Sequence, residues 1–283
     1  MKFTKMHGAG NDYVVVNCFH YAPPADPATL ARRMCKRHFG VGADGLILIC
    51  PSQKADALMR IFNTDGSEAE MCGNGIRCVG KYVYDHGICR NNPLSIETKA
   101  GIKKLQLYLR NGKVGKVRVN MGIPELATSA IPTTLGVERS GRGVALNTPL
   151  QVSGVSLLVN CVSMGNPHTV IFVDELQDDQ VRGLGPAIEN APVFPKRTNV
   201  EFVKVIAKNK VRVRVWERGC GETLACGTGA AAVCVAGFLT GRTDRNILVR
   251  MPGGALKVEW NTEDGCVYLT GRAKEVFCGE WPD

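Results

Sequence analysis

Hydrophobic and polar residues alternate in four segments of the chain, and this period-two pattern predicts strands that bury one face. The segments form two pairs. Leu58–Phe62 and Lys113–Val119 lie in the first half of the chain, and Lys210–Trp216 and Ala255–Trp260 lie in the second half. Each half is therefore expected to contain its own sheet.

A longer apolar run separates the two strands of each pair and predicts a helix. These runs, Ile76–Tyr84 and Ala230–Leu239, lack a polar face of normal width. A helix that is apolar nearly all round is buried on most sides. The expected fold is thus α/β (α+β), with two pseudo-symmetric lobes, each a curved, mostly antiparallel sheet wrapped around a central helix. Two further helices are expected, over Pro27–Arg37 behind the capping residue Asp26 and over Val181–Asn190.

The two halves also repeat a cysteine motif. Cys72-Gly73-Asn74-Gly75 and Cys226-Gly227-Thr228-Gly229 stand 154 positions apart, and in each case another glycine follows the cysteine by fifteen residues. A Gly-Asn pair precedes a buried strand at nearly the same offset, at Asn11 and at Asn166. Matched landmarks in one order at one offset indicate an internal duplication. We expect lobes of residues 1–120 plus 272–283 and of residues 121–271, with the active site in the cleft between them.

The composition of the chain and the lengths of its apolar segments indicate neither a nucleic-acid-binding protein nor a membrane-spanning one. The chain has 283 residues, of which 45% are hydrophobic, and its 35 basic and 26 acidic residues give a net charge of +9. The basic residues are scattered, so the surplus does not indicate nucleic-acid binding. No segment approaches the length of a membrane span and no leader is recognisable, which predicts a cytoplasmic or organelle-lumen protein.

Twelve cysteines are present, largely inside apolar stretches, and most are expected to be buried free thiols. No Cys-x-x-Cys occurs and the histidines lack ligand spacing, so a structural zinc site is not expected.

The repeated motif suggests a specific chemistry. A cysteine at the start of a helix stands beside free backbone N–H groups, where the helix dipole favours a thiolate and binds anions. Two such thiols facing one carbon atom could remove a proton from one side and return one to the other. An ordinary thiol pKa of about 8.5 makes both protonation states accessible near neutrality. The first-turn amides contributed by Gly73, Asn74, Gly227 and Thr228 could hold a carboxylate. Helix capping or close packing is the alternative explanation of the glycines.

Several segments together resemble a known family. They are Met6–Asp12, Phe62–Ser67, Met71–Cys78, Gly165–His168, Glu217–Gly219 and Ala225–Ala230. These segments closely resemble those of diaminopimelate epimerases, and the resemblance spans nearly the whole chain. The asparagine at position 74 resembles the residue of this family. The related proline racemases usually have a histidine at that position.

The resemblance implies a two-lobed isomerase that interconverts LL- and meso-diaminopimelate, for lysine and peptidoglycan synthesis, without pyridoxal phosphate or metal. It implies that Cys72 and Cys226 are the two bases, that His168 and Glu217 tune the thiols, and that the strand Ala273–Cys278 returns to the first lobe. A small-molecule partner is expected, with no nucleic acid and no membrane; the oligomeric state is open, with a homodimer considered. Implied substrate-binding residues are Asn11, Asn63, Gly73, Asn74, Asn166, Asn199, Glu217, Arg218, Gly227 and Thr228.

Each of these residues has a simpler explanation when it is taken alone. Asparagine beside glycine is usually a turn residue, which applies to Asn11 and Asn166. Glu217 and Arg218 could form an ion pair at a strand end, and His168 could be a half-buried structural histidine. One departure from the family is visible, because some members have glutamine where this chain has Gly45, so a substrate contact there is in doubt.

Three rival functions remain open. The same fold could act on proline-like or other amino acids, although Asn74 argues against this. A thiol redox protein could pair Cys72 with Cys226 in a regulatory disulfide. A binding module could hold an amino acid between its lobes without reaction.

Overall fold

Backbone contacts divide the chain into two units. The computed structural model describes residues 1–137 and 143–282, so residues 138–142 of the expected second lobe and Asp283 of the expected first lobe lie outside the described residues. Unit 1 contains Met1–Asn120 and the chain from Thr270 onward, and unit 2 contains Met121–Leu269. Strand β17 (Val267–Gly271) runs across the second boundary.

Unit 1 is built on a mixed sheet in which β18 pairs with β1, β1 with β2, β2 with β3 and β3 with β4. From β4 the pairing continues to β5 and β6, then from β6 to β7 and β8. The β2–β3 and β4–β6 pairs are parallel and the others are antiparallel. The strands are β1 (Lys2–Gly8), β2 (Asn11–Asn17), β3 (Gly45–Cys50), β4 (Ala57–Asn63), β5 (Glu68–Ala69), β6 (Leu94–Thr98), β7 (Gly101–Arg110), β8 (Lys113–Asn120) and β18 (Lys274–Glu280).

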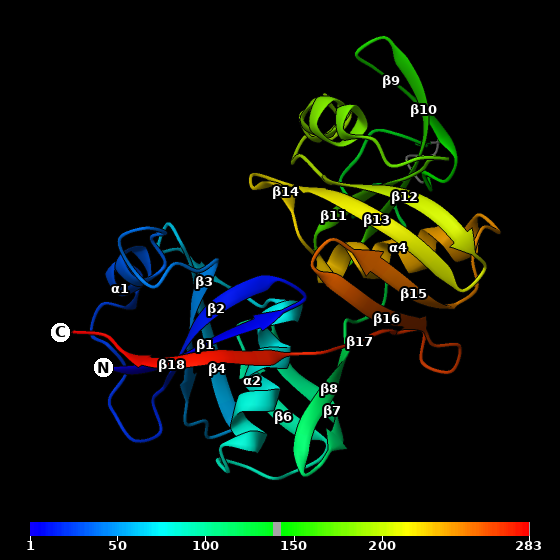
Figure 1. The fold of residues 1–283 in the computed structure, drawn as a ribbon. Helices are drawn as coiled ribbons and strands as arrows, with labels where there is room; N and C mark the ends of the chain where they lie inside the picture. Colours follow the sequence, from blue (N-terminus) through cyan, green and yellow to red (C-terminus); the bar gives the residue numbers. More distant parts are fainter. Residues whose placement is uncertain (138–142, 283) are drawn as a thin grey trace. The chain divides into compact units, whose positions relative to one another are not determined.

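Helix α2 (Gly73–Asp85) lies against the inner side of this sheet and contacts β1, β2, β4, β6, β7 and β8 (Figure 1). Ten of its thirteen residues are buried, which confirms the expected central helix. The same side of the sheet closes tightly on the helix, since a Cβ at Gly80 would lie 2.7 Å from Leu105 Cδ1.

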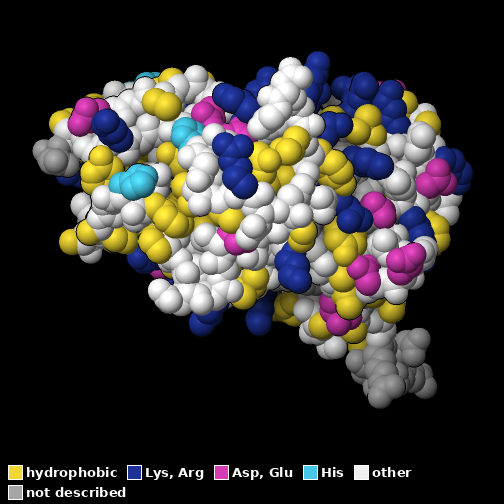
Figure 2. Space-filling model, turned by 90° about the horizontal axis from the view of Figure 1, so that it is seen from below, with side chains coloured by type: hydrophobic (Ala, Val, Ile, Leu, Met, Phe, Trp, Pro, Cys, Tyr) yellow, Lys and Arg dark blue, Asp and Glu magenta, His cyan; other side chains and the backbone are white. Residues whose placement is uncertain are grey.

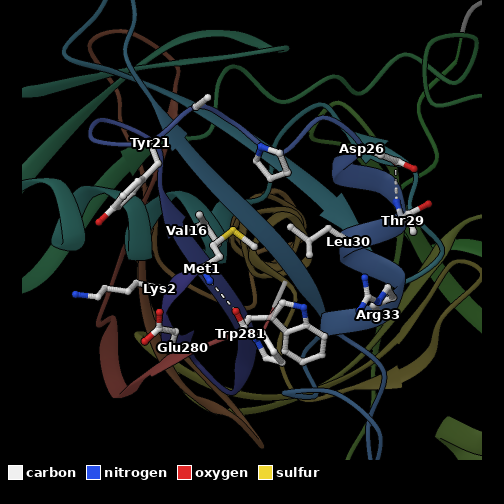
Figure 3. A pocket seen from close by; sticks show the side chains of 13 residues that line it. Met1, Lys2, Val16, Tyr21, Asp26, Thr29, Leu30, Arg33, Glu280 and Trp281 are labelled. Carbon is white, nitrogen blue, oxygen red and sulfur yellow. Dashed lines mark hydrogen bonds between the residues drawn. The ribbon is translucent and has the colours of Figure 1, made fainter.

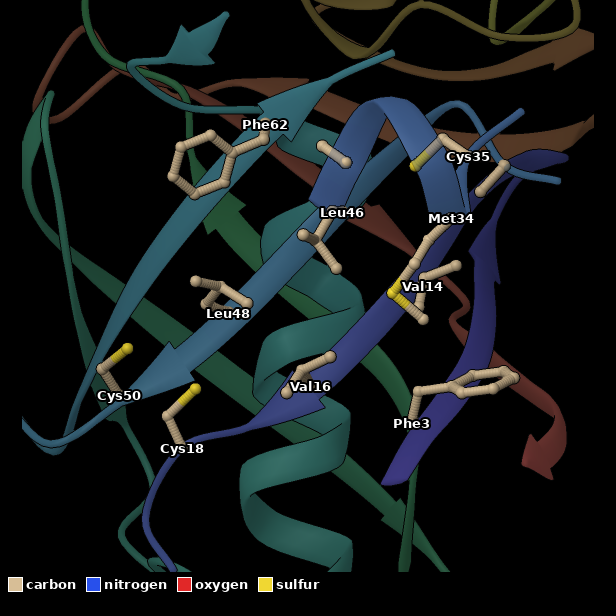
Figure 4. Packing of buried hydrophobic residues seen from close by; sticks show 12 residues of the cluster. Phe3, Val14, Val16, Cys18, Met34, Cys35, Leu46, Leu48, Cys50 and Phe62 are labelled. Atoms are coloured by element: carbon tan, nitrogen blue, oxygen red, sulfur yellow. The ribbon is translucent and has the colours of Figure 1, made fainter. Parts of the chain in front are cut away.

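The outer side of the unit 1 sheet is covered by α1 (Pro27–Met34), whose Met34 packs toward Val14 and Leu46 (Figure 4). Asp26 caps the helix by accepting from Thr29 N–H at 3.0 Å, as expected. The helix ends three residues before the predicted Arg37. The Met34 carbonyl accepts a hydrogen bond from Gly42 N–H at 3.0 Å, so the chain has already turned back there.

Unit 2 repeats the pairing scheme of unit 1. Strands β11 and β12 are parallel like β2 and β3, and β13 and β15 are parallel like β4 and β6, while β10–β11, β12–β13, β13–β14 and β15–β16 are antiparallel. The predicted duplication is confirmed at the level of strand pairing. The strands are β9 (Thr148–Val152), β10 (Val155–Ser163), β11 (Pro167–Phe172), β12 (Asn199–Ala207), β13 (Lys210–Glu217), β14 (Gly221–Thr223), β15 (Asn246–Met251) and β16 (Gly254–Trp260).

The central helix of unit 2 is α4 (Gly227–Leu239), which packs against β10, β11, β12, β15 and β16. Ten of its thirteen residues are buried, as in α2. The predicted helix over Val181–Asn190 differs from the structure, where a π-helix η1 (Asp179–Leu184) leads into α3 (Gly185–Glu189). Pro186 has no N–H to donate, so a regular α-helix cannot continue through it.

On the face drawn in Figure 2, lysine and arginine side chains are spread among acidic ones rather than gathered in one continuous patch. Among the described residues, no helix combines the length and the apolar character that a membrane span needs.

Candidate active site

Cys72 is the N-cap residue of α2, as the sequence predicted. Its Sγ lies 3.0 Å from the hydroxyl of Tyr13, on β2, and 3.8 Å from Asn11 Oδ1. The Tyr13 hydroxyl also donates to Asn11 Oδ1. Burial and the neighbouring Cys72 raise the pKa of Tyr13 well above its usual value, so this hydroxyl keeps its proton at neutral pH.

The amides of Asn11 and Asn74 lie beside Cys72 and are held by other polar groups. Asn74 Nδ2 donates to Asn11 Oδ1 at 3.3 Å, and Asn11 Nδ2 donates to Asp44 Oδ2 at 2.7 Å. On the other side, the fully buried Arg77 donates to Asn74 Oδ1 and to the Gly73 carbonyl, each at 2.8 Å. The first turn of α2 is therefore fixed around the thiol.

Asn63 belongs to the same row of the sheet, because β3 pairs Gly45 with both Tyr13 and Asn63. Its side chain is exposed and donates to Ser67 Oγ at 2.9 Å. A Cβ at Gly45 would lie 2.8 Å from the Phe62 carbonyl oxygen. The backbone thus occupies the space at Gly45 where a side chain would begin.

Cys226 is the N-cap residue of α4 and is more deeply buried than Cys72, with 5% of its surface exposed. Its Sγ accepts from Gly229 N–H at 3.4 Å and lies 3.4 Å from Thr228 Oγ1. Burial raises the pKa of this thiol well above 9.0, and the carboxylates of Glu217 and Glu201 raise it further. The Gly229 N–H in the first turn lowers this pKa, as expected of a helix end, but burial and the two carboxylates outweigh it.

Glu217 stands at the end of β13 and accepts a hydrogen bond from Thr223 Oγ1. Removal from water raises the pKa of its carboxyl, and hydrogen bonds from Thr223 and Cys226 and the nearby His168 oppose that rise. Glu217 does not pair with Arg218 in the described structure. The backbone N–H of Arg218 donates to Asn199 Oδ1 at 3.0 Å, and its guanidinium donates to the Lys196 carbonyl at 3.0 Å.

His168, on β11, is fully buried rather than half-buried. Its Nε2 lies 3.0 Å from Asn166 Oδ1 and its Nδ1 lies 2.6 Å from Glu201 Oε1. Asn199, at the start of β12, donates from Nδ2 to the Pro167 carbonyl at 2.8 Å. These contacts bring Asn166, His168 and Asn199 to one end of unit 2, where Cys226 also lies close to His168.

The two groups of residues correspond through the repeated topology. The β2–β3 register pairs Tyr13 with Gly45, and the β11–β12 register pairs His168 with Asn199. Asn11 and Asn166 each offer an amide oxygen to the side chain two residues later. Each unit therefore presents an N-cap thiol near a ring, Tyr13 or His168, that contacts the amide oxygen of an asparagine two residues earlier, while the remaining neighbours differ.

His168, Glu201 and Cys226 offer three metal-type ligand atoms within 4.8 Å of one another. Two ligands of a tetrahedral zinc, each about 2.1 Å from the ion, stand about 3.4 Å apart. The Nδ1 to Oε1 separation of 2.6 Å is shorter and matches a hydrogen bond. These residues do not fit a zinc ion as they stand.

A pocket of about 630 Å³ lies elsewhere in unit 1, where the chain ends meet (Figure 3). Tyr21, Leu30, Arg33 and Trp281 are among its lining residues, and the Met1 amino group donates to the Trp281 carbonyl at 2.6 Å. None of the predicted site residues lines this pocket.

Three residues at these sites were not predicted from the sequence: Tyr13, Asp44 and Glu201. Tyr13 begins the apolar run of β2 and Glu201 lies in the alternating strand β12, and neither pattern carries a functional signal. Correspondence within the duplication offers a signal for Tyr13, because it matches His168 at the same offset that relates Asn11 to Asn166.

The raised pKa of Cys226 predicts slow alkylation of this thiol. Iodoacetamide reacts with thiolates, and a thiol well below its pKa holds few of them. At pH 8 we expect the exposed Cys220 to be labelled before Cys226 in the native protein, as measured by peptide mass spectrometry. Glu217→Gln removes one carboxylate that raises this pKa, so Cys226 should be labelled faster in that variant. Equal labelling of Cys226 in the two proteins would contradict the electrostatic explanation.

Comparison of the sequence with a family model and with individual relatives gives the same family. The family model described as diaminopimelate epimerase matches residues 3–127 and 160–276. The chain is 52% identical to the diaminopimelate epimerase of Moorella thermoacetica over 283 residues, covering 100% of this chain and 99% of the relative. It is 50% identical to that of Acetivibrio thermocellus, covering 99% and 98%.

Solved structures share the fold at low sequence identity. A hydroxyproline epimerase from Agrobacterium vitis matches with a TM-score of 0.69 at 18% identity, covering 99% of this chain and 91% of the other. A Bacillus anthracis phenazine biosynthesis protein of the PhzF family matches with a TM-score of 0.70 at 17% identity, covering 100% and 99%. These similarities confirm the predicted fold, and the family model and close relatives show that the chain belongs to the diaminopimelate epimerase family.

Proposed function

We propose that this protein is an isomerase that interconverts LL- and meso-diaminopimelate, as its relatives are named to do, in the supply of lysine and peptidoglycan precursors. The observation that carries the proposal is the paired placement of Cys72 and Cys226, each as the N-cap of a buried helix in a repeated unit. The reaction requires both thiols to meet one α-carbon from opposite sides. One removes the proton and the other supplies a new one, so no pyridoxal phosphate or metal is needed for the proton transfer.

The environment of Cys226 supports its role as the proton donor. Cys226 holds its proton, because burial and two carboxylates raise its pKa, and it is therefore the donor in the first half of the reaction. Cys72 is the base in that half. While Cys72 is a thiol, the Tyr13 hydroxyl donates its hydrogen bond to Asn11 Oδ1. When a thiolate forms, the hydroxyl can rotate and donate to Cys72 Sγ, 3.0 Å away, instead. His168 and Glu217 tune Cys226.

The negative charge that develops on the substrate must be stabilised by hydrogen-bond donors that are already in position. As the α-carbon loses its proton, negative charge moves onto the adjacent carboxylate. The first turns of α2 and α4 supply backbone amides and the positive ends of two helix dipoles for that charge. The residues proposed to bind the substrate's carboxylates and amino groups are Asn11, Asn63, Gly73, Asn74, Asn166, Asn199, Glu217, Arg218, Gly227 and Thr228.

We also infer a cytoplasmic homodimer. All twelve cysteines are free, which is typical of a reducing compartment. Val276 and Phe277 on β18 are 58% and 47% exposed, and exposed large apolar side chains are suited to contact with a second copy.

Substitution of either thiol tests the function. Serine has the shape of cysteine but is a far poorer acid–base group at neutral pH. We expect Cys72→Ser and Cys226→Ser to keep the fold and to lower kcat for meso-diaminopimelate formation by about 10²- to 10⁴-fold, the usual contribution of a positioned acid or base. Chiral chromatography of the product measures the rate, and circular dichroism checks the fold.

The matched control is Cys220→Ser, which changes an exposed cysteine in unit 2. It should turn over at the parent rate. Full activity in either Cys72→Ser or Cys226→Ser would rule out the two-thiol mechanism. Tight binding of the amino acid by the parent protein with no isomerisation would instead indicate a binding module.

A further inference from the structure

Glu201 is a fully buried carboxylate on β12 with a single hydrogen-bond partner in the described structure. Its Oε1 lies 2.6 Å from His168 Nδ1, and its Oε2 has no hydrogen-bond partner among the described residues. An ionised carboxylate without a counter-charge is very costly in a protein interior. The charge of Glu201 therefore depends on His168.

Both ring nitrogens of His168 face oxygen atoms. Nδ1 faces Glu201 Oε1, and Nε2 faces Asn166 Oδ1 at 3.0 Å. Neutral imidazole has one donor and one acceptor nitrogen, whereas imidazolium has two donors. With the amide oriented as in the structure and Glu201 ionised, both nitrogens donate, and the ring carries the positive charge that Glu201 needs.

The repeated topology shows that this charged pair is particular to unit 2. Strand β2 pairs Val15 with Ile47, and the corresponding register in unit 2 pairs Val170 with Glu201. Tyr13 takes the place of His168 in unit 1. Both units thus keep an asparagine oxygen beside the ring, but only unit 2 has a carboxylate where unit 1 has isoleucine.

The first turn of α4 is shaped to admit this carboxylate. A Cβ at Gly229 would lie 2.6 Å from Glu201 Oε1 and 3.3 Å from Cys226 Cβ. Only a glycine lets the helix start so close to the carboxylate. The charged or titratable groups that face His168 are Glu201 from β12, Glu217 from β13 and Cys226 from the start of α4.

We propose that Glu201 is a positioning residue that holds His168 as an imidazolium, through Nδ1–H, beside Glu217 and Cys226. The cation offsets the two carboxylates next to the Cys226 thiol. Without it, their combined negative charge would oppose formation of the Cys226 thiolate in the direction of reaction where this thiol is the base. The effect on turnover rests on the proposed function, but the charge state of His168 does not.

The charge state is measured directly by nitrogen NMR of protein labelled with ¹⁵N-histidine. The chain has five histidines, and His168→Gln assigns the signal by its loss. At pH 7.5 we expect both ring nitrogens of His168 to be protonated in the parent protein. In Glu201→Gln one nitrogen should lose its proton, because an amide cannot balance the ring's charge. A neutral His168 ring in the parent protein would overturn the proposal.

Turnover then tests the consequence. Glu201→Gln should lower kcat/KM by about 10- to 100-fold, less than the loss of a base itself, and should change its pH profile. Asp85→Asn is the matched control, since Asp85 is a carboxylate with 5% exposure that pairs with Lys81 at the far end of α2. It should keep the parent profile. An unchanged profile in Glu201→Gln would also overturn the proposal.

If Glu201→Gln does not fold, the double variant His168→Tyr with Glu201→Ile copies the corresponding pair of unit 1 and removes both charges. Parent kcat/KM and pH profile in this folded variant would contradict a positioning role. If the parent protein isomerises no diaminopimelate but shows a doubly protonated His168, the proposed function fails and the ion pair stands.

Discussion

A thiol at the start of a buried helix is the constraint on which the rest of this structure depends. Each central helix is apolar on nearly every side, so the sheet can wrap around it, but its first turn still has backbone N–H groups that need acceptors. The sheet therefore stays open at that end, and polar side chains from the ends of neighbouring strands gather there. Cys72 and Cys226 occupy these two positions.

The duplication places a similar thiol site in each unit, but the groups buried around the two thiols differ. Cys72 lies beside a hydroxyl and two amides, whereas Cys226 lies beside two carboxylates and a histidine. Neutral neighbours can be buried at modest cost, but buried carboxylates need a compensating charge. The ion pair of His168 and Glu201 follows from this requirement.

The sequence was sufficient for the four alternating strands, the central helices and the N-cap positions of the thiols, because periodicity and the repeated motif report local structure directly. It was insufficient for Glu201. In Val200-Glu201-Phe202 the alternation of apolar and polar residues suggests a strand with one wet face, but α4 covers the face of Glu201 and all three residues are buried. Alternation shows that two faces differ and does not show what packs on each. The end of α1 was also missed, because it depends on hydrogen bonds from Gly42 and Ala43, which return from later in the chain.

The central claim is that two thiols act on opposite faces of one carbon, and isotope incorporation tests it most directly. Reduced protein would be incubated with LL-diaminopimelate in deuterium oxide, and both isomers would be separated and analysed by NMR and mass spectrometry at low conversion. Thiol protons exchange with solvent before substrate binds. The account predicts deuterium at the inverted α-carbon of the meso product, while recovered LL substrate keeps its proton. Deuterium in the recovered substrate at the same rate, or a meso product without deuterium, would contradict it.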